Sequence, residues 1–166
     1  MLMKNYAAFL LACVVVAGCA TVCTAADYLS PLVVIADKDG QNLYIAEYTA
    51  NQVAVFSLAE RKVSTVISLP DPPTGLALSP DQSRLYVTGG SPAGRVHIVD
   101  LTTCKLTASL PVGHTPVAPV LHPDGRTLYV CNRFNNDVSV IDLATVKELK
   151  RIPVSREPVA AVITPD

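Results

Sequence analysis

The sequence predicts an all-β fold built from repeated four-stranded units, and three observations support this prediction. A repeated tyrosine stands at Tyr44, Tyr86 and Tyr129, spaced by 42 and then 43 residues. A repeated proline has the same period, at Pro73, Pro116 and Pro158. After residue 27 the apolar residues alternate as in strands rather than following a helical period, and 13 prolines in the chain argue against long helices.

A period near 42 residues is typical of the four-stranded blades of a β-propeller. An immunoglobulin-like sandwich is the alternative all-β fold, but it gives no reason for an internal repeat of this length. We therefore expect β-propeller blades of four antiparallel strands at about residues 30–72, 73–115 and 116–157. Residues 158–166 would supply the first strand of the next blade, so the ring is incomplete.

Each repeat contains the signals of its four strands in order. A short apolar run comes first, as in "GLALS" (75–79) and "APVLH" (118–122). A turn follows at the recurring Asp39, Asp81 and Asp124, where proline presets φ and glycine accepts a positive φ. The second strand is "LYIAE", "LYVTG" or "LYVCN", whose tyrosine and β-branched residues suit a sheet packed on both faces.

The second half of each repeat predicts a third strand and an outer edge strand. The third is "QVAVFSL", "RVHIVDL" or "DVSVIDL", with alternating valines. The fourth is "KVSTVISL", "KLTASLPV" or "KELKRIPV", which is more polar and begins with lysine. A lysine at this place discourages pairing of the edge with other molecules.

The first 26 residues have the layout of an export signal. Lys4 precedes an apolar run, residues 6–18, that is short for a membrane span, and small residues follow. Two cleavage sites fit this segment. Ordinary cleavage before Asp27 follows "TAA", whereas "VAGC" resembles the lipobox of bacterial lipoproteins and would leave a lipidated Cys19 as the membrane attachment. Either way, we expect an exported protein, periplasmic or extracellular.

Charge and cysteine content narrow the classes of function. The chain has 13 basic and 14 acidic side chains and no basic stripe, so we expect no nucleic-acid partner. Cys104 and Cys131 remain after processing, and they are either two free thiols or a pair that joins two repeats. No C-x-x-C-H stretch is present for covalent c-type haem, and we expect no cofactor and no metal in this segment.

The phrases "SPDQSRLYVTGG" and "HPDGRTLYVCNRFNNDVSVIDLAT" resemble YVTN-type β-propeller repeats, which are named for the Tyr-Val-Thr-Asn run of their second strand. The third repeat matches three of the four letters, with Cys131 in place of threonine. In the second repeat, Gly89 stands where asparagine is usual. The resemblance extends over about residues 30–166 and implies an exported propeller similar to those of surface-layer and cell-envelope proteins. Relatives include lactonase-like enzymes and propellers joined to cytochrome or peroxidase domains.

The end of the chain repeats the beginning of a blade. "PVAAVITPD" matches "PVAPVLHPD" and would supply a first strand only. Propeller rings contain about four to eight blades, so three blades leave an apolar face open. We expect the remaining blades in the same chain, of which this sequence would be a fragment, or self-association of copies.

Ligands of propellers usually meet the face on which the inter-blade loops and the hairpins between second and third strands gather. The spacing places four candidate ligand-binding residues there: His114, Arg133, Arg156 and Glu157. A neutral imidazole at His114 suits a metal, a haem or a general base, and a solvated loop histidine is the alternative. Arg133 and Arg156 are candidates for a carboxylate or phosphate, or for surface ion pairs. No catalytic residue is assigned.

Two hypotheses for function follow. The first is an exported cell-envelope module, a binding or interaction scaffold that holds a protein or small ligand on the face described above. The second is the propeller part of an enzyme, either a lactonase-like hydrolase or a cytochrome- or peroxidase-associated oxidoreductase. The fold by itself does not decide between them.

Overall fold

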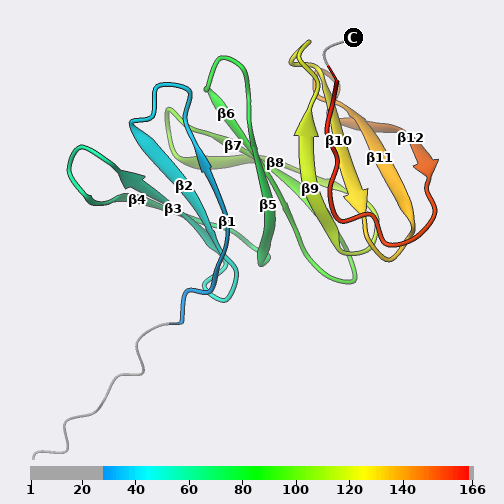
Figure 1. Ribbon diagram of the computed structural model, residues 1–166, viewed down its shortest axis with the longest axis horizontal. Helices are drawn as coiled ribbons and strands as arrows, with labels where there is room; N and C mark the ends of the chain where they lie inside the picture. The colour runs from blue at the N-terminus through cyan, green and yellow to red at the C-terminus, as the bar shows by residue number, and fades with distance from the viewer. Residues whose placement is uncertain (1–27, 165–166) are drawn as a thin grey trace, which may run out of the picture.

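The computed structural model describes residues 28–164, which form twelve strands in three separate antiparallel sheets (Figure 1). The first sheet contains β1 (Pro31–Ala36), β2 (Asn42–Glu47), β3 (Gln52–Ser57) and β4 (Lys62–Ser68). The second contains β5 (Pro73–Leu78), β6 (Arg84–Gly89), β7 (Arg95–Asp100) and β8 (Lys105–Pro111). The third contains β9 (Pro116–Leu121), β10 (Thr127–Asn132), β11 (Asp137–Asp142) and β12 (Lys147–Pro153).

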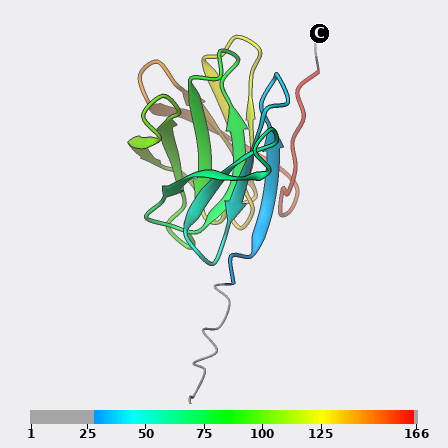
Figure 2. The same ribbon diagram turned by 90° about the vertical axis from the view of Figure 1, so that its left-hand side faces the viewer.

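The three sheets are built alike, as the repeat predicts. Each has its strands in chain order, joined by hairpins, and adjacent sheets meet through their first strands, β1 with β5 and β5 with β9. The repeated tyrosine has the same position in all three ladders, for example Tyr86 between Ala77 and Ile98. The sheets fan out side by side as propeller blades do, in an unclosed arc (Figures 1 and 2). The all-β propeller prediction is confirmed.

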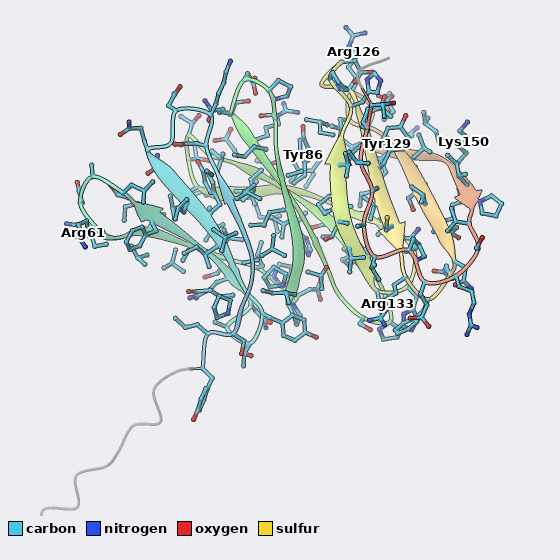
Figure 3. All side chains as sticks on the ribbon, viewed as in Figure 1. Arg61, Tyr86, Arg126, Tyr129, Arg133 and Lys150 are labelled. Atoms are coloured by element: carbon cyan, nitrogen blue, oxygen red, sulfur yellow. The ribbon has the colours of Figure 1, made fainter. Side chains whose placement is uncertain are left out.

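Two apolar clusters hold the blades together. Alternation along β6 directs Leu85 and Val87 into the cluster shared with the first blade, and Tyr86 into the cluster shared with the third. Because the second blade is covered on both faces, Tyr86 is only 2% exposed. The equivalent Tyr129 is partly exposed, since no described residues pack a further blade on that side. Figure 3 shows both side chains on their strands.

The first strands begin two residues earlier than the sequence pattern predicts. β5 begins at Pro73 and β9 at Pro116, and these prolines lie opposite Gly89 and Asn132. The first position of a strand tolerates proline because the missing N–H is not needed for the ladder. The prolines that mark the repeat therefore belong to the sheets themselves.

The turns between first and second strands are held by aspartate side chains. Asp124 Oδ1 accepts hydrogen bonds from the amides of Arg126 (2.7 Å) and Thr127 (3.1 Å), and Asp81 Oδ1 accepts from Ser83 (3.1 Å) and from the Ser79 hydroxyl (2.6 Å). These bonds lower the pKa of Asp81 to about 2, with the bond from Ser79 as the largest cause. In the first blade the turn is held by Asp37, at the position of Ser79, rather than by the predicted Asp39: its Oδ1 accepts from Gln41 N and its Oδ2 from Asn42 N.

Residues 158–164, expected as the first strand of a further blade, form no ladder with a described strand. A first strand pairs with the second strand of its own blade, and no such strand is among the described residues. Val159 and Ala161 instead line a groove of about 550 Å³ together with the inner strands β1, β5 and β9.

Cys104 and Cys131 are free thiols, so they do not form the disulfide bond that was the alternative. Burial raises the pKa of the Cys131 thiol.

No helix among residues 28–164 has the length and apolar character needed to cross a membrane. The predicted signal segment, residues 1–26, and the lipidation site Cys19 lie outside the described residues.

Candidate functional site

The inter-blade loops and the hairpins between second and third strands lie on one edge of the three sheets, here called the inter-blade face. The end of each fourth strand is tied to the preceding hairpin: Leu69 donates to Asn51 O (2.8 Å), Val112 to Gly94 O (2.9 Å) and Val154 to Asn136 O (2.9 Å). Arg133 lies on this face and Arg126 on the opposite edge of the third sheet (Figure 3). The four candidate ligand-binding residues were predicted to lie on this face because they occur in its loops and hairpins.

The asparagine of the repeated motif is a structural link on this face. Asn132 is fully buried, and its Oδ1 accepts from Gly113 N (3.0 Å) in the loop before β9. Its Nδ2 donates to Asp137 Oδ1 (2.6 Å) and Ser139 Oγ (2.7 Å) on β11. The amide therefore joins the inter-blade loop to the second and third strands of the blade.

The second blade makes the corresponding link with a histidine. Gly89 occupies the asparagine position, and a Cβ there would lie 2.8 Å from the Pro72 carbonyl oxygen, so the loop passes where a side chain would stand. His97, at the position of Ser139, is fully buried, with Nδ1 2.8 Å from Ser109 Oγ and Nε2 3.2 Å from Asp71 Oδ2. Nε2 lies within hydrogen-bond distance of Asp71 but is poorly aligned and makes no hydrogen bond.

Burial lowers the pKa of His97, and the nearby Asp71 carboxylate opposes this effect only in part. The ring is therefore neutral at pH 7, and the Asp71 side chain, 30% exposed, has no cationic partner in direct contact among residues 28–164. His97 was not among the site residues predicted from the sequence. The glycine at position 89, where the third blade has Asn132, is the sequence signal that could have identified His97.

Three of the four predicted ligand-binding residues come together around Phe134. Arg133 Nη2 lies 2.9 Å from Glu157 Oε2, and Nε donates to the same oxygen at 3.0 Å. The guanidinium carbon of Arg133 lies 5.0 Å from the centroid of the Phe134 ring, and the His114 ring meets Phe134 edge to face at 5.2 Å. His114 Nδ1 is 2.7 Å from Thr115 Oγ1. Arg156 is exposed and joins no ion pair or side-chain hydrogen bond within residues 28–164.

A hollow of about 270 Å³ opens beside this cluster on the inter-blade face. Its walls come from the loops and hairpins of all three blades. The lining residues are Tyr48, Asp71, Pro72, Thr74, Gly90, Ser91, Thr115 and Phe134. Tyr48 is 42% exposed and Phe134 is 51% exposed, so both aromatic rings are available to a ligand.

The sequence analysis did not single out Tyr48, Asp71 or Phe134. Phe134 could have been noticed because it is an aromatic residue in a hairpin turn. The equivalent residues of the other two blades are Thr49 and Ser91. No group of three or more His, Cys, Asp or Glu side chains suited to a metal ion occurs in the part of the chain that the structure describes. The site is thus an aromatic hollow with one carboxylate, next to an arginine–glutamate pair.

No protein-family model matches the chain. Among curated proteins, antigen Lp49 of Leptospira interrogans is 25% identical in an alignment of 118 residues that covers 63% of this chain and 26% of Lp49. Among solved structures, hydrazine synthase of Kuenenia stuttgartiensis has a TM-score of 0.75 at 26% identity, over 81% of this chain and 39% of that one.

Two further structures have the same fold. A Bacteroides fragilis protein with the proposed identity of a 6-phosphogluconolactonase has a TM-score of 0.70 at 26% identity, over 80% of this chain and 41% of its own. The structure of U3-55K has a TM-score of 0.68 at 14% identity, over 78% and 41% of the two chains. The chain therefore spans about a quarter of the curated relative and about 40% of these structures. The comparisons and the three sheets together show a β-propeller-like fold.

Proposed function

We propose that the protein is an exported cell-envelope module, a propeller scaffold that binds a ligand or protein on its inter-blade face. The hollow beside Phe134 is the observation that carries this proposal. It collects loops from three blades, and two exposed aromatic rings stand in its wall. Concave sites with aromatic walls and a few polar groups are the usual form of ligand sites.

Export and membrane attachment belong to the same proposal. The apolar run before residue 19 supports it, as does the similarity to an antigen of Leptospira. Cys19 would carry the lipid after cleavage in front of it. Production of the full sequence in a bacterium, followed by the mass of the N-terminal peptide, tests this part. An acylated peptide starting at Cys19 supports anchoring, a peptide starting at Asp27 supports export without an anchor, and an uncleaved N-terminus contradicts export.

Titration with a library of small fragments, followed by amide chemical shifts, tests the binding site. We expect saturable shifts at Tyr48, Thr115 and Phe134 on the inter-blade face. A second hollow, of about 350 Å³, lies among the turns of the opposite edge and includes Asp81 and Gly125, so it serves as the internal control. Shifts confined to those turns, or scattered over the surface, would contradict the proposal.

An enzyme part is the second candidate, and one arrangement favours it. Asp71, His97 and Ser109 have the chemical groups of a hydrolytic triad, and one structure with this fold is a proposed 6-phosphogluconolactonase. Against this candidate, His97 is fully buried, so the imidazole cannot pass a proton to a substrate as it stands. Hydrolysis of 6-phosphogluconolactone that is lost in Ser109→Ala and kept in Thr107→Val, a change on the same strand, would establish it.

A further inference from the structure

We propose that the hollow on the inter-blade face binds an alkylammonium group, held by the faces of Tyr48 and Phe134 and by the carboxylate of Asp71. This inference rests on the proposed function and specifies the chemistry of its ligand. Aromatic faces attract cations through the ring quadrupole, and aromatic walls are how proteins recognise quaternary ammonium groups. Three features of the hollow favour an alkylammonium ligand.

The first feature is the set of aromatic rings. Both are exposed and lie in the wall of the same hollow, although they come from different blades. Phe134 already accepts a cation in this structure, because the Arg133 guanidinium lies 5.0 Å from its ring centroid. Glu157 is ion-paired with Arg133, which reduces the repulsion that the guanidinium would exert on a second cation.

The second feature is the charge of the hollow. Asp71 is the one ionisable carboxylate among the eight lining residues, and no lining residue is cationic. His97 Nε2 lies 3.2 Å from Asp71 Oδ2 but is not hydrogen-bonded to it, and burial disfavours the charged imidazole. The Asp71 carboxylate therefore has free acceptor positions and no cationic side chain in direct contact among residues 28–164.

The third feature is that three of the four hydroxyl groups in the wall, those of Thr74, Ser91 and Thr115, are already engaged, which leaves only the phenol of Tyr48. Thr74 Oγ1 lies 3.1 Å from Thr88 Oγ1 and donates to the Pro116 carbonyl. Ser91 Oγ and Thr115 Oγ1 are 3.0 Å apart. A sugar would need several free donors and acceptors, whereas an ammonium group needs only the carboxylate and the ring faces. The volume of about 270 Å³ also suits a small head group.

A charged ligand and its uncharged isostere give the sharpest test. Choline and 3,3-dimethyl-1-butanol differ in the quaternary nitrogen and have nearly the same shape. At equal ionic strength, we expect choline to bind at least about tenfold more tightly, with amide shifts at Tyr48 and Phe134. Equal affinity of the two compounds, or stronger binding of the neutral one, would overturn the inference.

Single substitutions in the wall of the hollow test which side chains bind choline. Phe134→Leu keeps an apolar side chain and removes the ring face, and we expect about fivefold weaker choline binding. Asp71→Asn should weaken it by about tenfold or more, whereas Glu60→Gln, on an exposed carboxylate in another turn, should leave it unchanged. Phe134 is exposed, so its substitution leaves the core intact and remains informative if Asp71→Asn fails to fold. Unchanged choline affinity in Phe134→Leu contradicts the site.

The outcomes separate the two proposals. Neutral fragments that shift the inter-blade face, without preference for choline, keep the binding scaffold and remove the ammonium ligand. No shift at this face by any compound removes both. Where choline binds, trimethyl-lysine amide and dimyristoylphosphatidylcholine vesicles distinguish the source of the head group, because only the first fits a peptide partner and only the second a lipid surface.

Discussion

His97 Nε2 faces Asp71 Oδ2 at 3.2 Å across the junction between the third strand of the second blade and the loop that enters that blade. The two residues hold the place that an asparagine fills in the third blade. Because the imidazole is fully buried, the junction is favoured only while His97 is uncharged, and burial lowers the pKa of this ring. The stability of the protein should therefore depend on pH.

We predict that stability falls as the pH drops from 7 towards 5. Burial lowers the pKa of His97 in the folded state, whereas in the unfolded chain it is about 6.5. Below that value the unfolded chain takes up a proton that the folded chain does not, so the free energy of unfolding decreases. The His97 contribution is complete above the unfolded pKa, and it is lost progressively as the pH falls from that value through the lowered pKa of the folded state.

Urea unfolding between pH 5 and 8 measures this dependence. His97→Gln should be less stable at pH 7 and should show a flatter profile between pH 7 and 5. The turn aspartates have lowered pKa values, Asp81 among them at about 2, so their contribution is lost only below about pH 4. An unchanged slope in His97→Gln would show that another group causes the dependence.

Much of the fold was predictable because the repeat is local. Each blade is a run of consecutive hairpins, so turn residues and strand alternation within about 42 residues determine it. The period then gave the equivalent positions in the other blades. The starts of β5 and β9 were missed by two residues, because a proline normally indicates a loop and here opens a strand.

The site was predictable only in part. The loop positions of His114, Arg133 and Glu157 follow from the blade topology, and the structure brings these residues together. Gly89 in place of an asparagine points to His97, but its pairing with Asp71 could not be predicted from the sequence, because it depends on how closely the loop at Pro72 approaches Gly89. Such distances arise from packing between strands and have no local sequence signature.

We predict that Asn132→Ala lowers the free energy of unfolding by about 3 kcal/mol. The change leaves the buried Gly113 N without its acceptor, removes the bonds to Asp137 and Ser139, and opens a cavity at a fully buried position, although Ser139 keeps its bond to Glu148. Gln41→Ala, on an exposed turn residue, is the control and should change stability by less than about 0.5 kcal/mol. Chemical unfolding measures both, and equal effects would argue against the structural role of Asn132.

An asparagine placed in the second blade at the position equivalent to Asn132 should be harmful. A Cβ at residue 89 would lie 2.8 Å from the Pro72 carbonyl oxygen, so Gly89→Asn forces the loop away from its position. We expect a loss of about 2 kcal/mol in unfolding free energy, as for other overpacked sites. Thermal and urea unfolding test this, and a stabilised variant would show that the loop has room that the structure does not indicate.

The ion pair between Arg133 and Glu157 should contribute little to stability, although it organises the candidate site. Both side chains are more than 40% exposed, and exposed pairs are typically worth less than about 1 kcal/mol. A double-mutant cycle with Arg133→Gln and Glu157→Gln should give a coupling energy below about 1 kcal/mol that decreases further in 1 M salt. A larger, salt-independent coupling would mean that the pair is shielded from solvent. With a small coupling, Glu157→Gln leaves the fold intact, so a change in choline affinity in that variant reports directly on the charge beside Phe134.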